Sequence, residues 1–236
     1  MTELPEPPAD PLALPEEQVF KHDRRSRVWS VRDQEGNRWV IKHFLHSPHR
    51  QRLTAKLNVH PVQREFRWSE KLEESGVPVV PVATTGVGMH GRHWLVCPYM
   101  GVSLEQWLIH CDPVADLGKR RDLIRQIGKI TGQLLAGRLL HREYKASSLV
   151  IDDAGVLRLI DAGLIRSARE LPLLARALMM LTSLSSSVIE AAGKHAQPTK
   201  VAPTRTDRLR LFRSLASEWD SMPDGLARVL RSKEFG

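Results

Sequence analysis

Five residues of the sequence have side chains suited to phosphate binding, proton transfer or metal binding. Lys42 follows two β-branched residues, and Glu65 lies in a stretch with helical spacing. Glu143 and Lys145 are close together in the segment HREYK, and Asp161 starts the triplet DAG. A carboxylate can accept a hydroxyl proton or bind a divalent cation, and an ammonium group binds phosphates by charge. Each residue alone is more often a solvated surface charge, so the signal lies in their joint order.

The elements that would position these residues form a β-rich first half and a helical second half. Short runs rich in β-branched and aromatic residues predict strands, and apolar residues at helical spacing predict helices. The predicted strands are 19–20, 28–31, 39–41, 79–83, 94–97, 149–151 and 156–160. The predicted helices are 62–72, 104–109, 117–140, 171–192 and 206–219. Lys42 would then end a strand, Glu65 would lie on the next helix, and Asp161 would follow a hairpin.

This order of motifs resembles the protein-kinase-like superfamily over about residues 19–190. In that family a strand lysine binds phosphates and pairs with a helix glutamate, an H-R-D loop supplies the base, and D-F-G supplies a metal ligand. The corresponding segments here read HRE at 141–143 and DAG at 161–163. The resemblance implies an α+β, two-lobed protein-kinase-like fold with a small β-rich N-lobe and a short helical C-lobe.

The resemblance also implies the domain boundaries. Residues 1–18 are acidic and rich in proline, and are expected to form a disordered lead-in. Residues 19–97 would form the N-lobe and residues 98–236 the C-lobe, with a hinge near 98–101. Lys42 would face Asp161 across the cleft between the two lobes.

ATP and Mg²⁺ are the cofactors that the resemblance implies. Lys42, paired with Glu65, would bind the phosphates. The adenine would lie against the hinge, at Cys97 and Tyr99. The loop between the first two strands, residues 21–28, lacks all three glycines of the family's phosphate-binding pattern, so its arginines would have to bind phosphates by charge.

The catalytic and metal positions depart from the family pattern in two places. Glu143 would be the base in place of aspartate, and Lys145 would steady the transferred phosphoryl group. Asp161 would hold Mg²⁺, whereas Ser148 replaces the metal-binding asparagine and is a weaker oxygen ligand. An error of about 1 Å in the position of a catalytic group can cost on the order of 10²-fold in rate. A pseudokinase, which keeps the fold as a binding or scaffolding module, is therefore the alternative.

The segment after Asp161 indicates which branch of the superfamily the chain resembles. It has no A-P-E motif and passes almost at once into helix, and it looks like the bacterial lipopolysaccharide (Kdo/heptose) kinase family. That family phosphorylates sugar hydroxyls of the lipopolysaccharide core, so an anionic glycolipid or sugar would be the acceptor. Small kinases of the RIO and aminoglycoside-phosphotransferase types are alternatives.

Composition sets the expected location and partners. The formal charge is +8, and the first 19 residues carry five acids and no base, so the rest of the chain is strongly basic. The two cysteines, Cys97 and Cys111, and the absence of a long apolar run predict a cytoplasmic protein, associated at most peripherally with the inner membrane face. No nucleic-acid-reading module is recognised, so nucleic-acid binding is not expected.

Two histidine-containing groups could suggest metal or phosphate binding. His90 and His93 with Cys97, and His110 with Cys111, match no closed four-ligand zinc pattern, so zinc is not expected. The connection at 43–56 is rich in histidine, arginine and lysine. A solvated loop is the simplest reading of this connection, and contact with phosphate or a lipid headgroup is the alternative.

Overall fold

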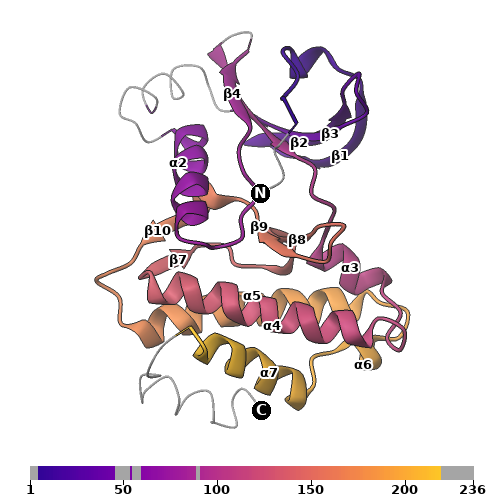
Figure 1. Ribbon diagram of the computed structural model, residues 1–236, viewed down its shortest axis with the longest axis vertical. Helices are drawn as coiled ribbons and strands as arrows, with labels where there is room; N and C mark the ends of the chain where they lie inside the picture. The colour runs from indigo at the N-terminus through magenta and orange to yellow at the C-terminus, as the bar shows by residue number, and fades with distance from the viewer. Residues whose placement is uncertain (1–4, 46–53, 55–59, 89–90, 219–236) are drawn as a thin grey trace. The chain divides into compact units, whose positions relative to one another are not determined.

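The protein consists of two compact units, residues 1–100 and residues 101–236 (Figure 1). The computed structural model describes residues 5–45, 54, 60–88 and 91–218. Unit 1 contains an antiparallel sheet with one long helix, and unit 2 is mainly helical with two small sheets. The chain is therefore mixed α+β. Most of the basic connection at 43–56 and residue His90 lie outside the described residues.

Unit 1 is built on a five-stranded antiparallel sheet with the strand order β1-β2-β3-β5-β4. Its strands are β1 (Glu16–His22), β2 (Ser26–Arg32), β3 (Arg38–Phe44), β4 (Thr84–Val87) and β5 (His93–Pro98). The central strand β3 pairs with β2 on one side and with β5 on the other, in an unbroken register. Because β3 has a hydrogen-bonded strand on each side, its side chains are held in fixed positions.

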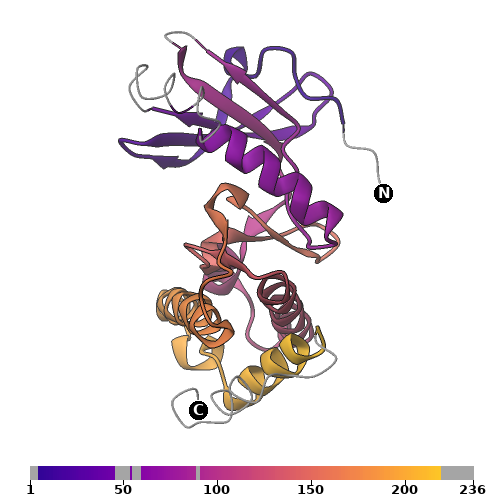
Figure 2. The ribbon, with the colours of Figure 1, turned by 90° about the vertical axis from the view of Figure 1, so that its left-hand side faces the viewer.

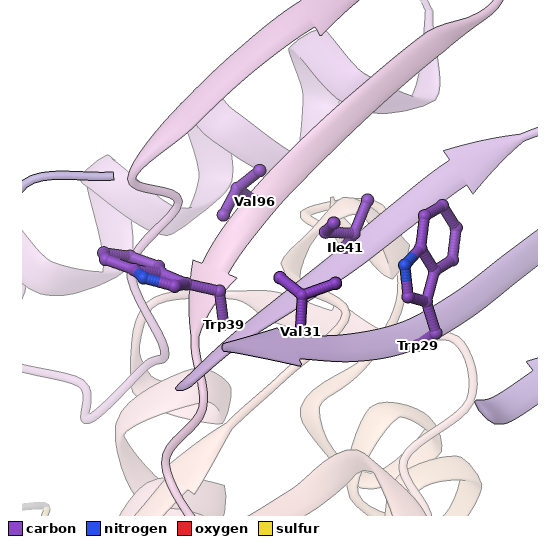
Figure 3. Close-up of a cluster of buried hydrophobic side chains, with 5 residues drawn as sticks. All are labelled: Trp29, Val31, Trp39, Ile41 and Val96. Carbon is purple, nitrogen blue, oxygen red and sulfur yellow. The ribbon is translucent and has the colours of Figure 1, made fainter. Parts of the chain in front are cut away.

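Successive side chains of a strand point to opposite faces, and this alternation divides the core of unit 1 in two. One face carries a cluster of aromatic and β-branched residues: Trp29, Val31, Trp39, Ile41 and Val96 (Figure 3). The opposite face carries Phe44 and Leu95, which pack against Val62 of helix α2 (Pro61–Glu74). Lys42, two residues before Phe44, therefore points to the helix side.

Helix α2 begins and ends with standard capping signals. The ring of His60 accepts a hydrogen bond from the Val62 N–H, and Pro61 occupies the first turn, where it costs no hydrogen bond. Gly76, with φ 72°, follows the helix in the left-handed region. The predicted helix 62–72 is confirmed, with slightly longer ends.

Two segments of unit 1 differ from the expectation. Part of the predicted disordered lead-in is structured, because a 3-10 helix spans Pro11–Ala13 and β1 begins at Glu16, whose carboxylate binds Arg27. The predicted strand at 79–83 is wrong: the strand that pairs with β5 is β4, which begins at Thr84. Pro78 precedes the predicted strand and Pro81 lies inside it, and proline has no N–H to donate to a sheet.

Unit 2 contains three main helices and several short elements. Its helices are α3 (Leu104–His110), α4 (Leu117–Ala136), α5 (Leu173–Gly193), α6 (Pro198–Val201) and α7 (Arg205–Ala216). Its strands are β6 (Val102–Ser103), β7 (Leu139–His141), β8 (Leu149–Ile151), β9 (Leu157–Leu159) and β10 (Ile165–Ser167). Two one-turn 3-10 helices, η3 (Ala146–Ser148) and η4 (Ala162–Leu164), lie beside the strands. Figure 2 shows α4 and α5 nearly end-on, with α7 below them.

Helices α4 and α7 pack at very short range. Gly128 and Gly132, four residues apart on α4, face the backbone of α7, and a Cβ atom at Gly132 would lie 2.8 Å from the Leu215 carbonyl oxygen. At the other end of α7, the buried Arg120 guanidinium donates to the Asp207 carboxylate at 2.7 Å. Close backbone contact and a buried ion pair thus attach α7 to α4.

The helix predicted at 117–140 ends earlier than expected. α4 stops at Ala136, Arg138 takes a left-handed φ of 57°, and Leu139 starts β7. The apolar residues Leu139 and Leu140 continue the helical pattern in the sequence, so periodicity alone does not separate α4 from β7. β7 pairs antiparallel with β10, and its last residue, His141, is the first residue of the HREYK motif.

Among the described residues, helix α5 is the one long and apolar enough, by length and composition alone, to cross a membrane. Its apolar window is 28% buried inside the unit, and the mostly buried core helix of a soluble protein passes the same test. Its buried residues include Ala177, Met180, Leu181 and Leu184.

Candidate functional site

Lys42 lies in the middle of the unit 1 sheet, on the face that α2 covers. Its register partners are Val28 on β2 and Leu95 on β5. Its ammonium nitrogen lies 5.7 Å from the centre of the Phe44 ring, within range of a cation–π interaction. The position is partly desolvated, so the charge needs a partner.

That partner is Glu65, on the inner face of α2. Lys42 Nζ lies 3.3 Å from Glu65 Oε2, and the two side chains are only 19% and 10% exposed. The ion pair expected from the sequence is present. Because β3 and α2 are both regular elements packed through Val62 and Phe44, the position of the pair is fixed by the core.

The hairpin between β1 and β2 is tightened by an aspartate. Asp23 accepts hydrogen bonds from the backbone N–H groups of Arg25 and Ser26 at 2.7 and 2.8 Å. These backbone hydrogen bonds, together with Lys21, lower the pKa of Asp23 to about 2. The loop N–H groups therefore bind a carboxylate of the chain itself, and only the exposed side chains of Arg24 and Arg25 extend outward.

Cys97 and Tyr99 occupy the end of β5 and the residue just past it. Cys97 pairs with Val40 of β3, and its side chain packs beside Phe44 and Leu95. The Tyr99 N–H donates to the Arg38 carbonyl at 2.9 Å, and the Arg38 guanidinium lies 3.9 Å from the centre of the Tyr99 ring. The Tyr99 N–H is thus bonded within unit 1.

In unit 2 the backbone of the loop 142–148 is held at several points. The Arg142 N–H donates to the Leu164 carbonyl, and Tyr144 is fully buried, with its hydroxyl 3.0 Å from the Thr131 hydroxyl. The Ala146 N–H donates to the Ser187 hydroxyl of α5 at 2.8 Å. Burial raises the pKa of Tyr144, so this tyrosine acts as a neutral anchor for the loop.

The loop side chains that the sequence analysis identified differ in exposure. Glu143 and Lys145 are exposed, and Lys145 Nζ lies 4.0 Å from Glu143 Oε2. Ser148 is buried, and its hydroxyl donates to the Glu143 carbonyl at 2.8 Å. The Ser148 side chain therefore closes the loop, whereas Glu143 and Lys145 extend from it into solvent.

Asp161 follows β9 in an unusual backbone conformation. Its φ of 57° and ψ of 41° lie in the left-handed region, which few residues other than glycine adopt without strain. The Ile160 N–H donates to the Ser148 carbonyl at 2.9 Å, so the backbone beside Asp161 is tied to the loop 142–148. The structure thus brings Ser148 and Asp161 to the same region of unit 2.

His141 lies beneath this region. It is 2% exposed, and its ring packs edge-on against Tyr144 with centroids 5.9 Å apart. Burial lowers the pKa of His141, although the nearby Asp161 carboxylate and the backbone at 160–161 act in the opposite direction. A neutral imidazole is therefore part of the core that supports Asp161.

The donor groups of unit 2 suit a metal that is shared with a ligand. Within the described parts of the chain, no group of three or more histidine, cysteine or acidic side chains could hold a metal ion. His93, named above in the zinc pattern, stacks on His60 at 4.0 Å between ring centroids. Mg²⁺ commonly uses one or two protein carboxylates together with phosphate oxygens and water. Asp161 fits that role, whereas the Ser148 hydroxyl already serves the loop.

Several supporting residues were missed in the sequence. Asp23, Thr131 and Ser187 hold loops through short polar contacts, and such residues have no periodic pattern. Only Asp23 has a local signal, because an aspartate two or three residues before exposed N–H groups favours a turn.

Comparison with known proteins adds no assignment. No protein-family model matches the chain, and no curated protein matches its sequence. The candidate site is therefore defined by the residues and contacts described above.

Proposed function

We propose that the protein is an ATP-dependent phosphotransferase with a protein-kinase-like fold, in which units 1 and 2 are the N-lobe and the C-lobe. The observation that carries this proposal is the ion pair between Lys42 on a central strand and Glu65 on the following helix, 3.3 Å apart and largely buried. A second support is the order of elements in unit 2, where the loop 142–148, the β8–β9 hairpin and Asp161 follow one another.

In this proposal Lys42 binds the phosphates of ATP. Its partner Glu65 keeps the ammonium group charged and aimed in one direction. Cys97 and Tyr99 would contact the adenine through their backbone. The hairpin at 22–26 would add the charges of Arg24 and Arg25, since its N–H groups are bonded to Asp23.

Asp161 would hold Mg²⁺ together with phosphate oxygens of the nucleotide. When bound, the ion neutralises charge that develops on the transferred group. The left-handed backbone of Asp161 supports this role, because strained conformations concentrate at sites where geometry matters. Burial keeps the nearby His141 neutral, so this residue would add no positive charge beside Asp161.

Glu143 would accept the proton of the acceptor hydroxyl. Its side chain is exposed, while its backbone is fixed by the Ser148 hydroxyl, so the carboxylate can reach a substrate in solution. Lys145, 4.0 Å from that carboxylate, would interact with the transferred phosphoryl group. The acceptor we propose is a sugar hydroxyl of lipopolysaccharide core or a similar anionic glycolipid at the inner face of the membrane, which the basic charge of the chain favours.

A pseudokinase is the second candidate, and Ser148 is the observation that favours it. The Ser148 side chain is 4% exposed and donates to the Glu143 carbonyl, so its hydroxyl is committed to the loop. A metal site with one protein carboxylate and an exposed glutamate base would be slow. In that case the protein would bind ATP, or a partner, without turnover.

Nucleotide binding is tested first, by thermal denaturation with ATP and Mg²⁺. A ligand at 100 times its Kd raises stability by about 2.7 kcal/mol, so the wild type should show a clear shift in Tm. Lys42→Met should remove that shift, and Lys71→Met, at a lysine of α2 next to Trp68, should keep it. A wild type whose Tm does not respond to ATP contradicts both candidates as nucleotide-binding proteins.

Phosphoryl transfer then separates the two candidates. Wild type, Asp161→Ala and Glu143→Asp/Ser148→Asn are assayed with labelled ATP on lipopolysaccharide core sugars, an aminoglycoside and a protein substrate. A wild-type rate that Asp161→Ala abolishes supports the enzyme, and the acceptor used distinguishes the glycolipid from the RIO and aminoglycoside types. A silent wild type with an active double variant supports the pseudokinase.

A further inference from the structure

Unit 2 contains an open apolar groove that the proposed phosphotransfer does not use. The groove has a volume of about 510 Å³ and is lined by residues of α3, α4, α5 and α7, with Val201 of α6 and Pro203. Volumes of about 300–1,000 Å³ are typical of sites for small organic ligands. Its floor includes Trp107, Leu123 and Ile127, which are buried, and Ile189 on one wall is 55% exposed.

The groove and the loop 142–148 lie against different sides of the same part of α5. Ser187 holds the Ala146 N–H, whereas Ser185, Ser186, Val188 and Ile189 line the groove. A ligand in the groove would therefore contact neither Glu143 nor Lys145 through these residues. Binding there requires no phosphotransfer activity.

One end of the groove is closed by a polar cluster whose hydrogen bonds are made within the protein. The Arg120 guanidinium donates to the Lys200 and Ala202 carbonyls and to the Asp207 carboxylate, at 2.9, 2.8 and 2.7 Å. Asp207 also accepts from Arg210 and caps α7 through Thr204. The floor of the groove thus offers a ligand apolar contact, and any charge on the ligand must bind at the rim.

The helices around the groove carry many cations. Residues 117–125 of α4 and the segment 198–213, which contains α6 and α7, hold nine lysines and arginines and only two aspartates. Exposed cations stand next to lining residues in the sequence: Lys200 precedes Val201, Lys119 and Arg121 flank Arg120, and Arg213 follows Phe212. These residues, together with the exposed Arg205, are called the basic rim below. An apolar groove with a cationic rim is complementary to a molecule with an apolar chain and a negative head.

We propose that this groove binds one acyl chain of an anionic lipid, with the headgroup at the basic rim formed by α6 and α7. Apolar side chains supply a contact area for the methylenes, and each methylene removed from water adds to affinity.

The test is calorimetric titration of the full chain with sodium alkanoates below their micelle concentrations. Affinity should rise roughly threefold per methylene from octanoate to dodecanoate, and butanoate should not bind. Ile189→Glu places a charge on the exposed wall and should weaken dodecanoate binding by roughly tenfold. Met179→Glu is the matched control, because Met179 is 51% exposed on the same helix and does not line the groove.

The headgroup is tested with the double variant Lys200→Glu/Arg205→Glu. It should weaken dodecanoate binding by roughly fivefold at low salt and by less at high salt, since exposed charges are screened. Circular dichroism melts establish that each variant is folded. Equal affinities of Ile189→Glu and Met179→Glu, or no binding of dodecanoate by the wild type, would overturn the proposal.

Vesicles separate insertion of a chain from simple attraction to a surface. Vesicles of phosphatidylcholine with phosphatidylglycerol should bind the wild type more strongly than Ile189→Glu. If both proteins bind these vesicles equally and neither binds dodecanoate, the basic rim binds the membrane surface by charge alone, and the groove proposal is wrong.

Discussion

Each of the two units contains a lysine–glutamate pair, and the two pairs are held very differently. Lys42 and Glu65 come from a strand and a helix, lie 3.3 Å apart and are mostly buried. Glu143 and Lys145 come from one loop, lie 4.0 Å apart and are about half exposed or more. The same residue types therefore form a fixed pair in unit 1 and a loose one in unit 2.

The loop of unit 2 is nevertheless well anchored, and the contrast concerns side chains only. Tyr144, Ala146 and Ser148 fix its backbone through buried hydrogen bonds. Unit 1 thus holds the charged side chains themselves in place, whereas unit 2 fixes only the backbone and leaves the Glu143 side chain exposed. Burial, and not residue type, should then decide how much each pair contributes to stability.

The effect of burial on stability is tested most strongly at a third ion pair, Arg120–Asp207. Its side chains are more buried than those of the two lysine–glutamate pairs. Asp207→Asn should lower the free energy of unfolding by about 3 kcal/mol, because it leaves the Arg120 charge buried with a weaker partner. Asp122→Asn, which breaks the exposed pair with Arg125, should cost about 0.5 kcal/mol or less. Urea denaturation measures both, and equal losses would contradict the role of burial.

The Asp207 pair should also depend on pH. Burial acts to raise the pKa of Asp207, but hydrogen bonds from Thr204 and the charge of Arg120 outweigh it, so the pKa lies below its usual value. The stabilisation is therefore present above the unfolded pKa, about 4, and is lost as pH falls through the folded value. The difference between wild type and Asp207→Asn should shrink between pH 7 and pH 3.

Glu65→Gln should have the next largest effect, at about 2 kcal/mol of unfolding free energy. Lys42 would keep its charge in a partly desolvated position with a weaker partner. A double-mutant cycle with Lys42→Met measures the coupling, and Glu70→Gln, on the exposed face of α2, is the control. A coupling energy near zero would show that the unit 1 pair is as loose as the unit 2 pair.

Asp161 separates a backbone effect from a side-chain effect. Asp161→Ala should be less stable than Asp161→Gly by about 1 kcal/mol, because alanine is strained at φ 57° and glycine is not. Both variants lose the carboxylate, so under the proposed function both should lose Mg²⁺-dependent phosphotransfer equally. If the two variants melt at the same temperature, the backbone of Asp161 must relax.

Glu143→Gln should have the smallest effect on stability, about 0.5 kcal/mol or less, since the side chain is exposed and its ion pair is long. Under the proposed function, its effect on the phosphotransfer rate should instead be large, on the order of 10²-fold, because general base catalysis would be lost. A stability loss as large as that of Glu65→Gln would show that the loop pair is structural.

The sequence predicted the elements that carry the site better than it predicted their ends. The strand with Lys42, the helix with Glu65 and the hairpin before Asp161 all occur, because strong apolar periodicity reports burial of a whole element. The predicted end of α4 and the predicted position of β4 were wrong. The local backbone geometry at Arg138 and Pro81 determines these ends, and it has little effect on the periodicity of apolar residues.

Polar contacts were the part of the site that could not be predicted. Ser187 and Thr131 contact the loop 142–148 through its residues Ala146 and Tyr144, which are 41 and 13 positions away in the sequence. No local sequence pattern predicts contacts between residues so far apart. Composition alone predicts a disordered lead-in at residues 1–18, yet Glu16 and Glu17 belong to β1. Their carboxylates are bound by Arg27, Arg32 and Arg38. Composition predicts whether a segment is ordered in isolation, whereas ion pairs with residues elsewhere in the chain can order it in the folded protein.

The close packing of α7 on α4 has a consequence for the order of folding. Gly128 and Gly132 leave a bare strip of backbone on α4, and the segment that covers it, residues 211–218, is more than 80 positions later in the chain. During synthesis at about 5–20 residues per second, that strip would stay uncovered for several seconds. Unit 2 is therefore expected to complete its core late, and ribosome-bound chains ending before α7 should be sensitive to protease within α4.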